Sequence, residues 1–218
     1  MIPLQFDKGA KDGLQILCLG CHSDDIEIGC GGSIIRLAEE YPDCVFHWVV
    51  FSAIDTRKAE AQHAASQFVD PSRLNGPILK EFPDGFMPFV GADIKYFFEE
   101  LKRTVKPNLI FTHNRNDAHQ DHRTIADLTW NTFRDHLILE YEIPKYDGDI
   151  GRPSVFVPLT SEVCETKIHL ITDAFRSQRE KHWFQADTFR SLMRLRGMEC
   201  NAPSGYAEAF YGRKLVLN

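Results

Sequence analysis

The sequence has no apolar run long enough to cross a bilayer: the longest surrounds Trp48–Phe51, whereas a spanning helix needs about 20 apolar residues. It also lacks an excess of positive charge, since 25 Lys and Arg residues stand against 31 Asp and Glu and the net charge is −6. We therefore expect no nucleic-acid partner, because neutralising phosphates requires clustered Lys and Arg. Met1–Lys8 lacks the charged and then apolar pattern of an export signal, so we expect a cytoplasmic protein.

Cysteine is scarce, with six among 218 residues, which excludes a disulfide scaffold. In a cytoplasmic protein we expect these thiols to be reduced. Cys18 and Cys21 have the spacing of a redox or zinc pair, but no second pair follows and Cys18 falls inside an apolar run, which favours simple packing. The chain has 43% hydrophobic and 26% charged residues over a length typical of one domain, which predicts a single domain spanning residues 1–218.

Strand-like and helix-like segments alternate along the chain. Short apolar runs predict strands, and apolar residues recurring every three or four positions predict helices. The expected strands are Leu14–Leu19, Cys44–Ala53, Pro77–Phe82, Asn108–Thr112, Leu137–Ile143, Ser154–Leu159 and Ala207–Leu217. The expected helices are Ser33–Tyr41, Arg57–Phe68, Ala92–Val105, Asp121–Phe133, Ser161–Arg176 and Asp187–Arg196. This order predicts an α/β fold with a mostly parallel sheet flanked by helices on both faces.

Two clusters of acidic residues and histidines follow the first and the fourth expected strands. The first is Cys21–Gly32, and the second is His113–His122, which contains three of the nine histidines. In the common doubly wound strand order 3-2-1-4-5, strands one and four are neighbours, and ligands bind at their carboxyl ends. Either cluster alone is explained equally well by solvated turns and packed histidines. Their coincidence at neighbouring strand ends favours a functional site.

Two imidazoles and one carboxylate from these clusters, His22, His122 and Asp25, form a three-ligand set for a borderline metal, with a position left for water or substrate. Asp24 points differently from its neighbour, and a carboxylate beside a metal-bound water can take its proton. His119 and Asp121 are spaced to form a histidine–carboxylate pair, able to stabilise an oxyanion or protonate a leaving amine.

Two alternatives remain at this point. His22 and Asp24 with a distant histidine also fit the facial triad of an Fe(II) oxygenase, although oxygenases of that kind are all-β. A non-catalytic module that binds a nucleotide or sugar would need no metal. Gly29 and Gly31 hint at a dinucleotide loop, but Ile34 occupies the third glycine position, so we expect these glycines to shape a turn beside the metal.

Both motifs resemble those of the PIG-L/LmbE-like superfamily of zinc-dependent N-acetylglucosaminyl deacetylases. The first family motif, Ala-His-Pro-Asp-Asp before a Gly-rich segment, stands here as Cys21–Asp25, with Cys21 for Ala and Ser23 for Pro. The second, His-x-Asp-His, stands as His119–His122. Looser similarity covers Arg57–Ala61, Phe82–Gly85, Ser177–Gln178, Arg196–Gly197 and Gly205–Phe210.

The resemblance implies a Rossmann-like fold and one Zn²⁺ per chain, or another divalent transition metal, held by His22, Asp25 and His122. It implies a hydrolase that removes the N-acetyl group from an N-acetylglucosamine-type conjugate, a small-molecule partner, through zinc-activated water. Asp24 would be the general base, and His119 would act at the intermediate or the leaving group.

The resemblance implies further roles for three residues. Asp121 would stand behind the first histidine of the second motif, and Arg57 and Asp84 would contact the substrate. Some members have a tyrosine two residues before that histidine, where this chain has Asp117. We expect Tyr206 to serve the oxyanion instead. The group attached to the amino sugar is not selected by any motif, and a homo-oligomer stays open.

Overall fold

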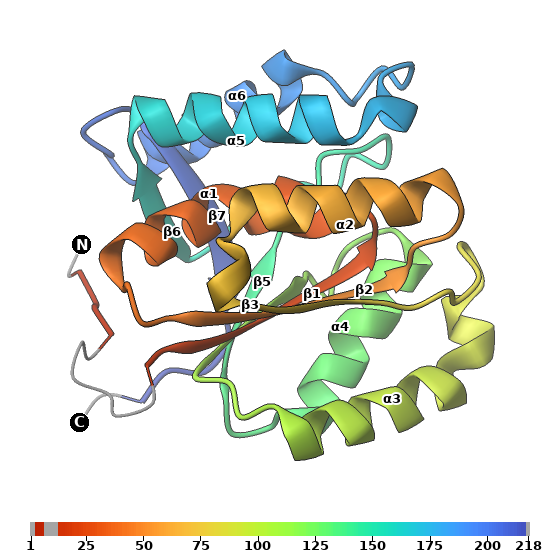
Figure 1. Ribbon diagram of the computed structural model, residues 1–218. Coiled ribbons are helices and arrows are strands. Elements are labelled where there is room, and N and C mark those ends of the chain that lie inside the picture. Colours follow the sequence, from red (N-terminus) through yellow and green to blue (C-terminus); the bar gives the residue numbers. More distant parts are fainter. Residues whose placement is uncertain (1–2, 7–12, 217–218) are drawn as a thin grey trace.

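The computed structural model describes residues 3–6 and 13–216 (Figure 1). Its strands are β1 (Gln15–His22), β2 (Val45–Ser52), β3 (Leu74–Leu79), β4 (Leu109–His113), β5 (Leu137–Tyr141), β6 (Val155–Leu159) and β7 (Tyr206–Gly212). Its longer helices are α1 (Asp25–Glu40), α2 (Thr56–Phe68), α3 (Gly91–Thr104), α4 (Gln120–Thr132), α5 (Ser161–Ala174) and α6 (Ala186–Glu199). Short 3₁₀ turns cover Pro71–Arg73, Met87–Val90 and Arg176–Gln178.

The strands form one sheet in the order β3-β2-β1-β4-β5-β7-β6. The first five strands are parallel, and β7 runs antiparallel to both β5 and β6. The central strands are buried on both faces, which explains why they are continuous apolar runs without alternation. The expected α/β fold and the order 3-2-1-4-5 are therefore confirmed, and β1 and β4 end side by side.

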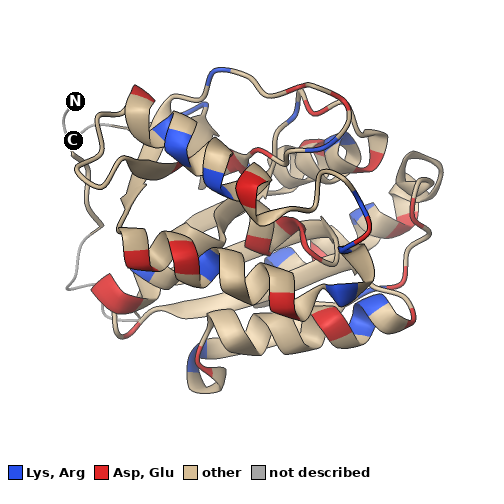
Figure 2. Ribbon diagram, turned by 90° about the horizontal axis from the view of Figure 1, so that it is seen from above, with Lys and Arg blue, Asp and Glu red and all other residues tan. Residues whose placement is uncertain are grey.

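Helices cover both faces of the sheet (Figure 1). α1 and α2 lie on one face with α5 packed over them, while α3 and α4 lie on the other. Each face has its own apolar core, exemplified by Trp48 on the first and by Phe51, stacked on Phe98 with ring centroids 5.2 Å apart, on the second. Basic and acidic residues are interspersed over the helices (Figure 2). Within residues 3–6 and 13–216, no helix has the length and apolarity needed to span a membrane.

The main difference from the expected elements is that α1 begins at Asp25, eight residues before the expected start at Ser33. Gly29, Gly31 and Gly32 therefore lie inside this helix, and the expected turn is wrong. They are needed for close packing: an added Cβ at Gly29 would lie 2.2 Å from the Tyr141 ring. Smaller shifts occur at β3, which begins at Leu74, and at the last strand, which ends at Gly212; Leu217 lies outside the described residues.

The cysteines behave as the sequence predicts. All six are free and buried, including Cys18 and Cys21. Cys18 lies within β1 and is fully buried, so packing explains its presence.

Candidate functional site

The two acid–histidine clusters meet at the carboxyl ends of β1 and β4. His22 is the last residue of β1, and His113 is the last residue of β4. Asp24 is the N-cap of α1, and His119 is the N-cap of α4. Two strand ends and two helix starts thus bring together side chains that are far apart in the chain, as the strand order predicts.

Three atoms at the centre of this cluster face one another. His22 Nδ1 lies 3.2 Å from His122 Nε2 and 3.4 Å from Asp25 Oδ2. His122 Nε2 and Asp25 Oδ2 lie 3.6 Å apart. Ligand atoms held about 2.0–2.2 Å from a tetrahedral metal lie roughly 3.3–3.6 Å from one another. The three side chains are largely buried. They could therefore hold one divalent ion without rearrangement.

The outer nitrogens of both histidines lie against carboxylates. His122 Nδ1 is 2.9 Å from Asp117 Oδ2, and His22 Nε2 is 3.0 Å from Asp84 Oδ1. A hydrogen-bonded carboxylate on the outer nitrogen is typical of metal-binding histidines, because it fixes the ring and raises its basicity. His122 has this hydrogen bond, whereas the contact of His22 with Asp84 is an ion-pair contact alone. Asp84, expected to contact substrate, thus lies on a histidine of the cluster, with 71% of its side chain exposed.

Asp117 is a residue whose part in the cluster the motifs do not reveal. Its other oxygen, Oδ1, lies 3.0 Å from Lys145 Nζ. Burial acts to raise the pKa of Asp117, but the His122 hydrogen bond and nearby cations outweigh it and hold the pKa well below its usual range. Asp117 therefore stays ionised and orients His122 Nδ1 away from the centre.

His113 is a second such residue. It is fully buried, with Nε2 3.2 Å from Asp25 Oδ2 and its ring stacked on His122 at a centroid distance of 3.9 Å. The backbone N–H of His22 also donates to Asp25 Oδ2, at 2.6 Å. Burial acts to raise the pKa of Asp25, yet His122 and His113 hold it well below its usual range. The sequence places His113 in the second acid–histidine cluster, but neither family motif includes it.

Beside the central triplet, three further triplets of described residues have ligand atoms within 4.8 Å of one another: Cys21, His22 and His122; Asp25, His113 and His122; and His22, Asp84 and His119. Cys21 is the thiol among them. Its Sγ lies 3.1 Å from Met87 Sδ, and burial raises the pKa of this thiol to about 12. A protonated thiol is a poor ligand, whereas Asp25 is already ionised.

Asp24 is paired with Arg57 from α2, whose Nη2 lies 2.8 Å from Asp24 Oδ1. Burial raises the pKa of Asp24, and Arg57 opposes this shift. The guanidinium also lies over the Phe175 ring, 5.5 Å from its centroid. Arg57, expected to contact substrate, therefore contacts the expected base. A buried carboxylate beside one fixed cation is more basic than usual and held in one orientation.

The expected pair between His119 and the Asp121 carboxylate is not formed. Asp121 instead accepts hydrogen bonds from the N–H groups of Gly85 (2.6 Å) and Met87 (3.1 Å). The reason is helix geometry: α4 starts directly after His119, so the backbone N–H of Asp121 points back at the cap and donates to His119 Nδ1 at 3.3 Å. With Nδ1 accepting, a neutral His119 carries its proton on Nε2.

The structure does not bring Tyr206 into this cluster. It begins β7, and the Arg194 guanidinium lies over its ring, 5.9 Å from the centroid. Tyr141, at the end of β5, is the tyrosine in contact with the histidines: its hydroxyl lies 3.2 Å from His113 Nε2 and donates to the Leu19 carbonyl at 2.6 Å. Tyr141 is fully buried, so it contacts His113 from the interior of the protein and supports its position.

Glu27, in the first turn of α1, is buried with one carboxyl oxygen unpartnered among the described residues. Burial raises its pKa from 4.5 to about 8. Between these values the unfolded chain is ionised while the folded chain stays protonated, so this group costs more stability as pH rises. We expect Glu27→Gln to stabilise the metal-free protein, with a gain that grows by up to about 1.4 kcal/mol per pH unit from pH 4.5 to 8.

Urea unfolding of both proteins between pH 4 and 8 measures this gain. Glu39→Gln, at an exposed position of the same helix, controls for the change in net charge. A gain that stays constant across the range would contradict the burial of an uncharged Glu27.

The fold and the cluster define an α/β protein with a candidate metal site at the ends of two central strands. The chain belongs to the PIG-L family: the family described as GlcNAc-PI de-N-acetylase matches residues 17–133, which include both acid–histidine motifs.

Several solved structures share the fold along nearly the whole chain. A conserved protein from Thermus thermophilus is 21% identical, with a TM-score of 0.75 and coverage of 94% of this chain and 97% of that one. N,N'-diacetylchitobiose deacetylase from Pyrococcus horikoshii is 18% identical, with a TM-score of 0.71 and coverage of 95% and 87%. The 4-carboxy-2-hydroxymuconate hydratase from Pseudomonas putida is 17% identical, with a TM-score of 0.71 and coverage of 94% and 99%. Because this fold accompanies both a deacetylase and a hydratase, the fold alone does not determine the activity.

Proposed function

We propose that this protein is a zinc-dependent deacetylase that hydrolyses the N-acetyl group of an N-acetylglucosamine-type conjugate, with residues 1–218 acting as one domain. The observation that carries the proposal is the central triplet, whose three ligand atoms are 3.2–3.6 Å apart. Membership of a family described as a de-N-acetylase supports the reaction. The similar fold of a deacetylase of N,N'-diacetylchitobiose supports an N-acetylated amino sugar as substrate.

His22, Asp25 and His122 would hold the ion, since their ligand atoms converge and the outer nitrogens of the two histidines lie against carboxylates. When bound, a divalent ion of this kind lowers the pKa of a coordinated water and polarises an amide carbonyl. Another divalent transition metal would bind the same donors. Asp117, hydrogen-bonded to Nδ1, keeps the His122 ring in the orientation that the site needs.

Asp24 would take the proton of the attacking water. Its burial raises the pKa, which makes the carboxylate a stronger base, while Arg57 keeps it ionised and oriented. His119 would act on the amide oxygen or on the leaving amine, because its Nδ1 is occupied by a backbone N–H and its Nε2 carries the proton. The backbone of Asp121 therefore supplies the orientation that we expected from its side chain.

The competing oxygenase triad needs Asp24 as a ligand and leaves Asp25 unused. The geometry favours the opposite assignment, since Asp25 lies against both histidines while Asp24 pairs with Arg57. The parallel α/β sheet also differs from the all-β folds of those oxygenases.

Acetate release tests the proposal directly. The purified protein is assayed with a panel of N-acetylglucosamine conjugates, and its metal content is measured after aerobic purification. We expect stoichiometric zinc and acetate release that does not depend on oxygen. Zinc-loaded protein that releases no acetate from any member of the panel, or that hydrates an unsaturated acid instead, would contradict the proposal.

Asp117→Asn should weaken zinc binding by about 10- to 100-fold, because the carboxylate no longer anchors His122 Nδ1. Competition with a chromogenic chelator measures the affinity. Asp149→Asn is the matched control, since Asp149 also contacts Lys145 but does not touch His122. Equal zinc affinities in the two variants would show that Asp117 does not support the ligand.

A further inference from the structure

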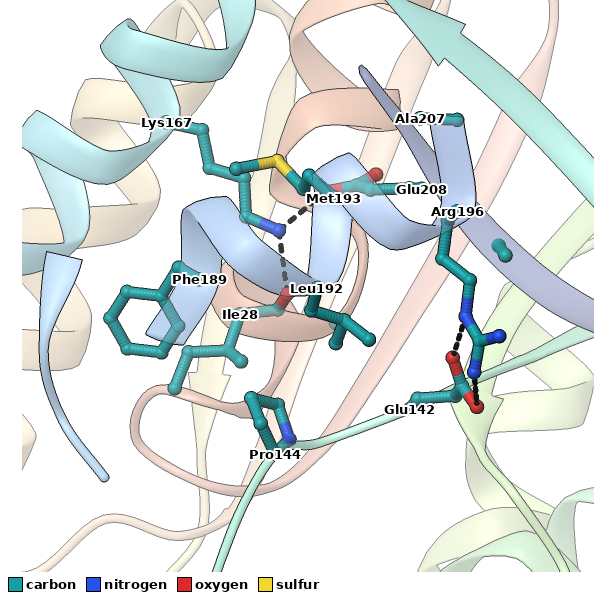
Figure 3. Close-up of a pocket in the computed structure, with 12 residues that line it drawn as sticks. Ile28, Glu142, Pro144, Lys167, Phe189, Leu192, Met193, Arg196, Ala207 and Glu208 are labelled. Atoms are coloured by element: carbon teal, nitrogen blue, oxygen red, sulfur yellow. Dashed lines mark hydrogen bonds and ion pairs between the residues drawn. The ribbon is translucent and has the colours of Figure 1, made fainter. Parts of the chain in front are cut away.

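A buried ion pair lies beneath the site and has no part in the chemistry proposed above. Lys167 of α5 and Glu208 of β7 are 2% and 4% exposed, and Lys167 Nζ lies 2.6 Å from Glu208 Oε1 (Figure 3). Two charges removed from water are costly unless every polar atom finds a partner. The partners of this pair offset that cost.

Both charges bind the backbone of α1. Lys167 Nζ donates to the carbonyl of Ile28 at 2.6 Å, and Glu208 accepts from the N–H of Gly32 at 2.8 Å and of Ser33 at 2.6 Å. A regular α-helix would join the N–H of Gly32 to the carbonyl of Ile28 directly. The ion pair therefore binds the donor and the acceptor of the same helical hydrogen bond, one turn into α1.

Gly32 permits this approach. An added Cβ there would lie 3.0 Å from Glu208 Oε1 and 2.6 Å from Leu159 Cδ1. A side chain at this position would push the carboxylate away from the backbone. The contact between Glu208 and α1 therefore depends on a glycine at position 32, which is far from Glu208 in the sequence.

Ile28, whose carbonyl this pair binds, ends the first turn of α1, which carries the acidic residues of the site. The N–H of Ile28 donates to the carbonyl of Asp24 at 2.9 Å, and Asp25 is the first residue of α1. On its other side the same turn is packed on Tyr141, which approaches Gly29 and donates to the carbonyl of Leu19 in β1. The first turn of α1 is therefore fixed between the ion pair and the strand that carries His22.

We propose that Lys167 and Glu208 are positioning residues, which set the first turn of α1 so that the Asp25 carboxylate faces His22 and His122. This inference rests on the proposed metal site. Neither residue touches the reacting atoms. Their effect reaches the site through Ile28 and the backbone of Asp24.

A second buried ion pair, which lines the same cavity, provides a matched control. Arg196 and Glu142 also line it and are also buried, with Arg196 Nη2 2.8 Å from Glu142 Oε1 (Figure 3). The further contacts of Arg196 are with Glu199 and the carbonyl of Gly151, none of which belongs to α1. Breaking this pair leaves a buried charge unpaired, as breaking the first does, without releasing the helix.

The experiment compares Lys167→Met with Arg196→Met in the full-length protein, after circular dichroism has shown that both are folded. Zinc affinity is measured by chelator competition, and the amides of residues 25–33 are followed by hydrogen exchange. We expect Lys167→Met to weaken zinc binding at least about tenfold and to accelerate exchange in this segment. Arg196→Met should change zinc affinity less than about twofold, even if it lowers thermal stability as much as Lys167→Met does.

If Lys167→Met does not fold, the double variant Lys167→Met/Glu208→Gln takes its place, because it buries no unpaired charge. Unchanged zinc affinity or unchanged exchange in residues 25–33 would overturn the inference, and so would equal losses in the Arg196 variant. The proposed function fails separately: wild-type protein that binds zinc but releases no acetate refutes the deacetylase while leaving this comparison intact.

Discussion

Asp24→Asn is expected to lower kcat for acetate release by about a hundred- to ten-thousand-fold while the protein keeps one zinc per chain. Asparagine has nearly the same size as aspartate but cannot accept the proton of the attacking water. The ligand atoms of the central triplet do not include Asp24, whose partner is Arg57 at 2.8 Å. Loss of turnover without loss of metal is therefore the signature of a base that is not a ligand.

Asp25→Asn gives the contrasting result, because this residue lies 3.4 Å from His22 Nδ1 and 3.6 Å from His122 Nε2. It should lose both zinc and activity. Metal analysis and initial rates on the two purified variants separate the roles of neighbouring aspartates. Normal turnover in Asp24→Asn, or zinc loss equal to that of Asp25→Asn, would refute the assignment of the base.

The architecture of this protein could be predicted from local pattern because its central strands are short apolar runs and its helices have clear periodicity. The order of β1 and β4 follows from a rule about parallel sheets, and that rule is sufficient to bring His22 and His122 together. The antiparallel β7 and the pairing of β6 follow no such rule, because they depend on contacts between distant segments.

The start of α1 could not be predicted, because glycine is unfavourable inside a helix by intrinsic propensity. Here tertiary packing overrides propensity: Gly29 meets Tyr141, and Gly32 meets Glu208. Neither contact is visible in the local sequence. For this reason the three glycines beside the acidic motif suggest a turn in the sequence, although they lie inside a helix in the structure.

The finer arrangement of the site also depends on three-dimensional contacts. Spacing alone suggests that Asp121 pairs with His119, but the start of α4 directs its carboxylate to a different loop. Asp117 and Tyr141 contact the histidines from positions that no motif distinguishes. Sequence patterns thus identify the residue types that converge, whereas the partner of each outer nitrogen depends on backbone direction.

His122→Ala is expected to weaken zinc binding by more than about 100-fold, beyond the loss caused by a supporting carboxylate, and to abolish acetate release with it. His122 Nε2 faces both His22 Nδ1 and Asp25 Oδ2, so its removal leaves two donors, too few for a site that must keep a position open.

The matched control is Cys21→Ala, which removes the competing thiol of the cluster. Because burial keeps that thiol protonated and it packs on Met87, we expect full zinc content and activity in this control. Zinc content by mass spectrometry and titration distinguishes the two assignments: if Cys21→Ala loses zinc while His122→Ala retains it, the ligand set is wrong.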